Sequence, residues 1–352
     1  MTSVPDVGAA GILVQGLRRS FADVHAVRDV SFAAHPGRVT ALVGPNGSGK
    51  TTLMLMLGTL LRPDAGTIRI GGIDPVAEPE RVRATLGWMP DALGAWPSLT
   101  ARETLVVTAR LYRIDRAQAA ERATALLAQV GLHELADAPA RVLSRGQKQR
   151  LGLARALVHD PRVLLLDEPA SGLDPAARVE LRTLLRRLAA EGRTILVSSH
   201  VLSELEEMAD DAVFMVKGTT VSTERVAAAS QSRRLWRVRV VGGDTSVKTQ
   251  RLLASALPDV DAAGLRIDRR DILVPLSSEA DAARALAALV GVGLAVTEFA
   301  PATGDLEHTF LDLGTGESLS PTNSTTEQPS TEQPSTEQPI AERPSTEEGS
   351  AS

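Results

Sequence analysis

The sequence predicts two folded units and a tail: an α/β domain over residues 11–222, a small α+β domain over 232–314 and a disordered segment over 320–352. In the first unit, short apolar runs such as VTALV and VLLLD alternate with long helical patterns, which is typical of an α/β domain with buried strands. In the second, the apolar segments follow the order βαββαβ, which indicates a ferredoxin-like fold. In the third, a polar five-residue repeat replaces the apolar pattern.

The net charge of −5 belongs to the tail and not to the folded body. The last 33 residues carry six glutamates against Arg343 alone, so the rest of the chain is close to neutral. The repeat STEQP is too polar to bury enough apolar surface to offset the entropy lost on ordering, and we expect it to be disordered. A neutral body lacks the basic patch that nucleic-acid binding usually requires, so nucleic acid is not an expected partner.

Two further features limit the possible classes of protein. The chain contains no cysteine, which excludes disulfide scaffolds, thiol chemistry and cysteine-containing zinc sites. No apolar run reaches the 18 or so residues that a membrane helix needs, and the N-terminus shows no secretory signal. We therefore expect a chain that does not itself cross a membrane and that works in the cytoplasm.

The first motif is GPNGSGKTT, residues 44–52, which stands between the apolar strand pattern VTALV and the apolar run LMLML. A strand, a glycine-rich turn and a helix are the context of a phosphate-binding loop, and the fold class expected for residues 11–222 is that of a P-loop NTPase. The glycines allow consecutive amide groups to turn toward one anion, and the helix N-terminus adds its positive end. The nucleotide-binding residues predicted here are Gly44, Pro45, Asn46, Gly47, Ser48, Gly49, Lys50, Thr51 and Thr52. Lys50 is expected to reach the β- and γ-phosphates of ATP, and the Thr51 hydroxyl to bind Mg²⁺.

The second motif is VLLLDEP, residues 163–169, in which an apolar strand ends in two adjacent acids. Successive strand residues point in opposite directions, so Asp167 and Glu168 cannot perform the same task. We assign Asp167 to the Mg²⁺ shell and Glu168 to the attacking water as general base. A pair of acids at a strand end is more often a solvated terminus than a site, but the preceding phosphate loop makes the catalytic interpretation strong.

Three more motifs follow the phosphate loop: LSRGQ from Leu143, SGLD ending at Asp174, and ILVSSH ending at His200. With them the first 220 residues resemble the ABC (ATP-binding cassette) ATPase family, in which two cassettes pack head to tail. The resemblance implies a cassette with a helical subdomain. It also implies that Ser144, Gly146 and Gln147 of the signature LSRGQ, together with Asp174 of the D-loop, belong to the nucleotide site shared between two cassettes.

The resemblance also suggests roles for His200 and Phe21. His200 matches the family's switch histidine, which contacts the γ-phosphate within its own cassette. Phe21, in the segment RRSFADV, is similar to the aromatic residue on which the family stacks adenine. A core phenylalanine beside a hairpin is an equally good interpretation of Phe21 from the sequence alone.

Two positions depart from the family pattern. Arg145 stands where the common signature has glycine, but the neighbouring Ser144 and Gly146 match, so binding is expected to survive. In WMPDAL, residues 88–93, Asp91 matches the position at which the family usually has a glutamine that binds Mg²⁺ and senses the membrane subunit. An aspartate is shorter and anionic, and it could still reach Mg²⁺ through a water. The alternative is a different register, in which another residue of this loop makes the contact.

The sequence therefore predicts an ATPase that uses ATP and Mg²⁺, forms a homo- or heterodimer of cassettes, and energises integral-membrane permease subunits from the cytoplasmic face of the membrane. The segment DLEHTFLDL, residues 305–313, is similar to the ending of cassettes from the drug- and polysaccharide-export subgroup, which favours export. The alternatives are a soluble ABC ATPase without a transport role, and a nucleotide-binding regulator without turnover. The presence of Glu168 argues against the second of these.

Overall fold

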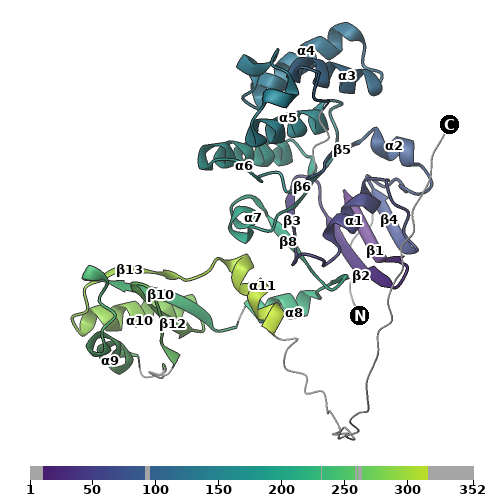
Figure 1. Cartoon of the computed structure of the whole chain (residues 1–352). Coiled ribbons are helices and arrows are strands. Elements are labelled where there is room, and N and C mark those ends of the chain that lie inside the picture. Colours follow the sequence, from purple (N-terminus) through teal and green to yellow (C-terminus); the bar gives the residue numbers. More distant parts are fainter. Residues whose placement is uncertain (1–10, 92–95, 231, 258–259, 261–263, 316–352) are drawn as a thin grey trace, which may run out of the picture.

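The computed structural model describes residues 11–315 except 92–95, 231, 258–259 and 261–263. The predicted tail, residues 320–352, lies outside the described residues. The chain forms a nine-stranded sheet with helices on both of its faces and, farther along, a separate four-stranded sheet (Figure 1). Among the described residues, no helix combines the length and the apolar character needed to span a membrane.

The large sheet has the strand order β4-β1-β2-β9-β8-β3-β7-β6-β5. Strands β5, β6, β7, β3 and β8 pair in parallel, whereas β1 pairs antiparallel with both β2 and β4. Its strands are β1 (Ile12–Phe21), β2 (Val24–Ala34), β3 (Val39–Val43), β4 (Ala65–Ile70), β5 (Leu86–Met89), β6 (Val163–Asp167), β7 (Thr194–Ser198), β8 (Asp211–Val216) and β9 (Thr219–Thr220).

The parallel strands are mostly apolar because helices cover both faces of the sheet. Leu42, Leu165 and Leu196 face one core, which α1 completes, whereas their sequence neighbours face the other core, which α5, α6 and α7 complete. This alternation follows from the two-residue period of a strand. Figure 1 shows α1 on one side of these strands and α6 and α7 on the other.

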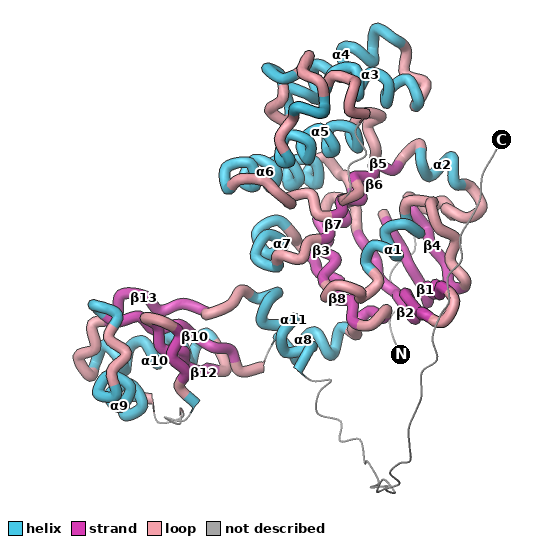
Figure 2. Tube along the Cα trace, viewed as in Figure 1, coloured by secondary structure: helices cyan, strands magenta, loops and turns pink. Residues whose placement is uncertain are grey.

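The helices of this part include a group inserted between β5 and β6, namely α3, α4 and α5, which forms the helical subdomain at the top of Figure 2. Each of the three begins at a residue whose side chain accepts a backbone N–H: Thr100, Asp115 and Ser144, respectively. The helices are α1 (Lys50–Leu57), α2 (Pro79–Arg83), α3 (Ala101–Leu111), α4 (Arg116–Gln129), α5 (Arg145–Leu157), α6 (Pro175–Ala190), α7 (Leu202–Met208) and α8 (Thr223–Ser230), with short 3₁₀ helices at His133–Leu135 and Ala140–Val142.

The second sheet is antiparallel, with the strand order β11-β12-β10-β13, which is the order of a ferredoxin-like fold. Its core contains Val238, Ile272 and Val274 from the strands and Leu253 and Leu289 from the helices. The elements follow the predicted order βαββαβ: β10 (Arg234–Val240), α9 (Val247–Ala256), β11 (Arg266–Asp268), β12 (Asp271–Leu276), α10 (Glu279–Gly291) and β13 (Val296–Pro301), with a short 3₁₀ helix at Val241–Gly243.

The last described helix, α11 (Asp305–Thr315), packs against α7 and α8 rather than on the second sheet (Figure 1). Leu313 is buried in the core of the large domain, and Leu306 and Phe310 pack against the same core. The boundaries predicted from the sequence place this helix in the second unit, residues 232–314, whereas its apolar side chains belong to the core of the large domain. The chain thus leaves the cassette at α8, forms the second sheet, and returns to the cassette with α11.

The helical subdomain meets the large sheet at a half-buried histidine, His159. The ring of His159 stacks on that of Tyr112, with centroids 3.8 Å apart, and its Nε2 donates a hydrogen bond to the Leu86 carbonyl at 3.1 Å. Its Nδ1 is buried and has no hydrogen-bond partner among the described residues. Burial, opposed by the hydrogen bond to Leu86, lowers the pKa of His159 from 6.5 to about 4.

We expect His159 to make the protein less stable in mild acid. Between pH 6.5 and about 4 the unfolded chain binds a proton that the folded His159 does not, so the free energy of unfolding falls as the pH decreases through this window. In thermal unfolding followed by circular dichroism, the Tm of His159→Gln, which can still donate to Leu86, should fall less than that of the parent over this range. A Tm difference between the two proteins that is independent of pH would contradict this assignment.

Candidate nucleotide site

The phosphate loop connects β3 to α1, as the sequence predicts. All five residues of β3 are buried, and the chain then turns through the glycine-rich segment. Gly49 caps α1 with a φ of +99°, and a Cβ at this position would lie 2.4 Å from the Ala26 carbonyl oxygen. Only glycine fits there, because both the backbone conformation and the approach of β2 exclude a side chain. The start of α1 therefore opens directly onto the loop.

Lys50 is the first residue of α1, and its side chain folds back across the loop. Its ammonium group donates to the carbonyl oxygens of Gly44 at 2.6 Å and Pro45 at 3.1 Å. Burial lowers the pKa of Lys50, and the negative charges of Glu168 and Asp167 oppose that shift. The loop thus holds a desolvated cation beside two acids, an arrangement suited to a phosphate group.

A cavity of about 630 Å³ lies over this loop and brings the two sequence motifs together. Of the predicted loop residues, Gly44, Pro45 and Ser48 do not contribute to its wall. Its wall contains Val24, His25, Ala26, Asn46, Gly47, Gly49, Lys50, Thr51, Thr52, Leu55, Trp88, Pro90, Asp91, Asp167 and Glu168.

Asp167 is a buried carboxylate at the end of β6. Its Oδ1 accepts a hydrogen bond of 2.5 Å from the Ser198 hydroxyl on the neighbouring strand β7. Burial raises the pKa of Asp167, the negative charge of Asp91 adds to this shift, and Ser198 and Lys50 oppose it. A cation bound nearby would therefore stabilise the ionised form of Asp167.

Glu168 follows in an unusual backbone conformation, with a φ of +53° that L-residues seldom adopt. Its N–H donates to the Ser198 carbonyl at 3.1 Å, and its side chain turns into the cavity, where Oε2 accepts a hydrogen bond from His200 Nδ1 at 2.9 Å. Burial raises the pKa of Glu168, and the hydrogen bond and charge of His200 oppose the shift. A half-buried carboxylate with a raised pKa is chemically suited to take a proton from water.

The residues predicted to bind Mg²⁺, namely Thr51, Asp167 and Asp91, all line the same cavity. In the described part of the chain no three acidic or histidine side chains lie close enough to hold a metal ion by themselves. This donor set suits Mg²⁺, which usually binds one or two carboxylates together with waters and the phosphates of a substrate. The direct role predicted for Asp91 stays a prediction.

The signature residues do not contribute to the cavity formed by their own chain. Ser144 and Gln147 instead cap α5 reciprocally: the Ser144 hydroxyl accepts from the Gln147 N–H at 3.2 Å, and Gln147 Oε1 accepts from the Ser144 N–H at 2.8 Å. Gly146 lies against the carbonyl of Gly172. Asp174 caps α6, where its carboxylate accepts from the Ala177 N–H at 2.9 Å. Their predicted contacts with nucleotide would need a second cassette.

Phe21 ends β1 at the hairpin with β2 and pairs with Val24, a residue of the cavity wall. The Phe21 residue is 44% exposed, so the interpretation as a core phenylalanine is wrong. The guanidinium of Arg19 lies over its ring, 4.8 Å from the centroid. Adenine stacking on Phe21 stays a prediction.

Two residues that hold the acids in place, Ser198 and Gln149, were not predicted from the sequence. Ser198 meets Asp167 because β6 and β7 are adjacent in the sheet, a neighbourhood that the chain order does not reveal. The Gln149 side chain donates from Nε2 to the Glu168 carbonyl at 2.6 Å. Its position two residues after LSRGQ, on the buried face of α5, is the one signal that could have identified it.

Comparison with known proteins agrees with this geometry. The model of the ABC transporter family matches residues 27–171. The Nod factor export ATP-binding protein I of Ralstonia nicotianae is 35% identical over 261 residues, which cover 74% of this chain and 81% of that protein.

Two other similarities cover most of the respective relatives. The daunorubicin/doxorubicin resistance ATP-binding protein DrrA of Streptomyces peucetius is 32% identical over 308 residues, 86% of this chain and 92% of that protein. A solved ATP-binding subunit of an ABC transporter superposes with a TM-score of 0.57 at 28% identity, covering 62% of this chain and 92% of the solved one. The P-loop cassette fold and the ATPase activity predicted from the sequence are thereby confirmed, and the chain belongs to the ABC transporter family as one of its ATP-binding subunits.

Proposed function

We propose that the chain is the ATPase of an exporter and that it works as a pair of cassettes, either two copies or one copy and a related cassette. The observation that supports the pairing best is the separation of the two halves of the site: Lys50 and Glu168 line one cavity, whereas Ser144 and Gly146 lie outside it. ABC ATP-binding subunits dimerise, and a second cassette would bring a signature over each bound ATP. The export direction rests on the relatives named for Nod factor export and for daunorubicin/doxorubicin resistance.

In the proposed reaction each residue has a separate task. The Lys50 ammonium would bind the phosphates of ATP. The Glu168 carboxylate would take a proton from the attacking water, and His200 would orient that carboxylate through its hydrogen bond. Mg²⁺, held through Asp167 and Thr51, would supply charge neutralisation at the phosphates. Hydrolysis would leave ADP and phosphate, which no longer hold the two cassettes together.

The membrane partner would dock on an exposed apolar surface where the helical subdomain meets the large sheet. We name this the joint surface; it is formed by Leu60, Trp96, Leu111 and Tyr112, which are 65%, 42%, 72% and 38% exposed. Exposed large apolar side chains that gather in one place mark interaction sites. Subunits of this family work with membrane permeases, and a cytoplasmic loop of such a permease is the partner that we propose.

Contacts between the elements bring these residues together. Arg83 donates a hydrogen bond to the hydroxyl of Thr59, the neighbour of Leu60, at 3.0 Å. Burial raises the pKa of Tyr112, and the positive charge of the same Arg83 opposes this shift. The guanidinium of Arg155 lies 5.8 Å from the centre of the Trp96 ring, and its charge acts on Tyr112 as well. Gly58, two residues before Leu60, lies against the ring of Trp88, and Trp88 lines the cavity, so a partner on the joint surface would sense the nucleotide. It would also place the chain at the cytoplasmic face of the membrane.

We expect a charge on the joint surface to release the chain from its membrane partner. A tagged chain expressed with its native partners should carry a polytopic membrane protein through purification in mild detergent, whereas Leu60→Glu should lose it. The isolated Leu60→Glu subunit should keep its basal ATPase activity, since Leu60 is exposed and does not line the cavity. Val247→Glu on α9, also at an exposed apolar residue, is the matched control. Purification of the parent without any membrane protein would favour the soluble, non-transport alternative.

A further inference from the structure

One face of α5 makes hydrogen bonds to the segment that carries Glu168. Arg145 and Gln149 are four residues apart, which places them on the same side of the helix. Arg145 Nη2 donates to the Ser171 hydroxyl at 2.7 Å, and Gln149 Nε2 donates to the Glu168 carbonyl at 2.6 Å. Two polar side chains of the signature helix therefore hold the loop between β6 and α6 at two points of the same chain.

This loop needs external support because its backbone is unfavourable. Glu168 has a φ of +53°, and such a conformation persists only where the surroundings enforce it. The Glu168 carbonyl accepts both from Gln149 and from the Ser171 N–H, the latter at 3.1 Å. Ser171 is thus held at two points, because its N–H donates to Glu168 and its hydroxyl accepts a hydrogen bond from Arg145. The orientation of the Glu168 peptide, and with it the direction of its side chain, is thus coupled to the first two turns of α5.

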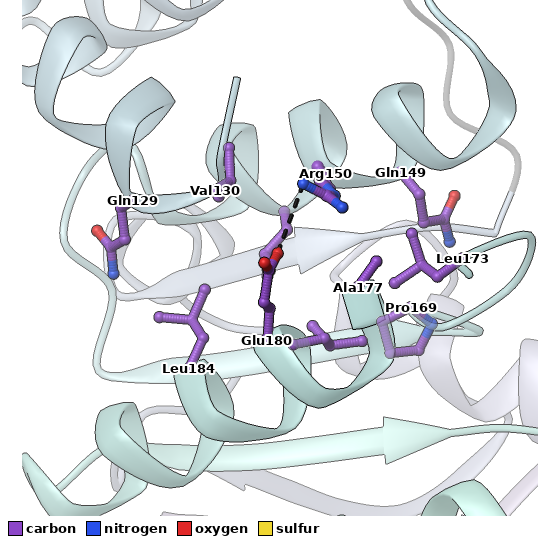
Figure 3. Close-up of a pocket in the computed structure, with 11 residues that line it drawn as sticks. Gln129, Val130, Gln149, Arg150, Pro169, Leu173, Ala177, Glu180 and Leu184 are labelled. Carbon is purple, nitrogen blue, oxygen red and sulfur yellow. Dashed lines mark ion pairs between the residues drawn. The ribbon is translucent and has the colours of Figure 1, made fainter. Parts of the chain in front are cut away.

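The contact at the start of α5 is close, whereas the contact farther along is loose. Gly172 has a φ of +74°, and a Cβ there would lie 2.7 Å from Cδ of Arg145, so the loop fits directly against that side chain. One turn later a cavity of about 40 Å³ separates α5 from α6, and Gln149, Pro169 and Leu173 line it (Figure 3). Ala170 and Leu173 of the loop share an apolar core with α5, but the cavity leaves this packing incomplete, so the polar contacts of Arg145 and Gln149 add to it.

Helix stability does not account for Arg145. A cation in the first turn of a helix is opposed by the positive end of the helix dipole. The start of α5 is already capped by Ser144 and Gln147. A glycine at position 145, which is the common residue in this signature, would leave the Ser171 hydroxyl without this donor. Arg145 thus departs from the common signature, and its partner, Ser171, lies in the same loop as the candidate base Glu168.

We propose that Arg145 and Gln149 are positioning residues: they act through Ser171 and the Glu168 carbonyl to orient the Glu168 carboxylate toward the attacking water. The proposal rests on the assignment of Glu168 as general base. Neither side chain needs to touch the nucleotide bound in its own cassette, because both act on the backbone and the hydroxyl of the loop. Their removal should therefore slow hydrolysis and leave nucleotide binding in the same cassette intact.

The test measures kcat and the affinity for a fluorescent ATP analogue separately in the isolated subunit. Losing one of these hydrogen bonds should lower kcat by about 3- to 10-fold in Arg145→Met, in Ser171→Ala and in Gln149→Met, with the affinity unchanged. Arg145→Lys, which keeps a cationic donor, should recover part of the loss. Arg141→Met, at an exposed arginine four residues earlier, is the control and should keep the parental kcat.

A double-mutant cycle tests the route of the effect. If Arg145 acts through Ser171, the double variant Arg145→Met with Ser171→Ala should be no slower than either single variant. Additive losses, or a weaker affinity for the analogue at an unchanged kcat, would mean that Arg145 acts on the nucleotide and would overturn the proposal. An active Glu168→Gln would overturn the underlying base assignment instead. An inactive Glu168→Gln beside fully active Arg145→Met and Gln149→Met would refute the positioning role alone.

Discussion

Glu168→Gln is expected to reduce ATP hydrolysis by about 10²- to 10⁴-fold and to leave ATP binding intact, because a general base acts on the attacking water and adds little to nucleotide affinity. The geometry assigns hydrolysis and ATP binding to different groups. The Glu168 carboxylate lies in the cavity with Lys50 and accepts a hydrogen bond from His200, while the phosphate loop supplies the binding groups. Glutamine keeps the size of the side chain and can still pair with His200, so the variant removes basicity with little change of shape.

Blocked hydrolysis should also change the oligomeric state. With Mg²⁺ and ATP the Glu168→Gln subunit is expected to elute from size-exclusion chromatography as a dimer, because bound ATP is no longer converted to products. Asp174→Ala is the control at the proposed interface and should elute as a monomer. Near-parental single-turnover hydrolysis by Glu168→Gln would rule out its role as base. A strictly monomeric, inactive Glu168→Gln would argue against the pairing of LSRGQ with the site of a second copy.

The pH dependence of the parent provides a second measure of the same group. Since burial raises the pKa of Glu168, its basic form is lost on acidification at a higher pH than for an ordinary glutamate. The acid limb of kcat should therefore lie above pH 4.5, the usual pKa of a glutamate, and it should be absent from the residual activity of Glu168→Gln.

Local motifs account for the part of the site that the sequence could predict. The phosphate loop and the pair Asp167 and Glu168 are each encoded within a few residues, so strand periodicity and glycine spacing were enough to find them. The P-loop fold followed from the same runs, because the strands β3, β6 and β7 are buried on both faces and are mostly apolar. The order βαββαβ of the second sheet was also readable from the alternation of its segments.

Features that depend on distant parts of the chain were not predictable in this way. Ser198 reaches Asp167 only because β7 lies beside β6, and Arg145 reaches Ser171 only because α5 packs on the loop after β6. Helix α11 follows the second unit in the chain but buries Leu313 in the core of the first. An amphipathic stripe shows that a helix has an apolar partner, but not which one.

Lys50→Ala is expected to abolish detectable ATPase activity by weakening nucleotide binding. The loop contains no other cationic side chain, and the loss of charge-assisted hydrogen bonds to phosphate should weaken binding by about 10- to 100-fold. Fluorescent-nucleotide titration measures this directly. Lys248→Ala, at an exposed lysine on α9, is the control and should bind like the parent.

The interpretation of this variant must separate binding from loop structure, because Lys50 also donates to the carbonyls of Gly44 and Pro45. Lys50→Met keeps most of the buried aliphatic stem and removes only the ammonium group. If both variants lose affinity while the Tm of Lys50→Met stays near the parental value, the missing charge is the cause, since the loop remains folded around the same stem. If Lys50→Met instead binds ATP and turns it over like the parent, the cavity over this loop is not the nucleotide site, and the roles assigned to Asp167 and Glu168 fail with it.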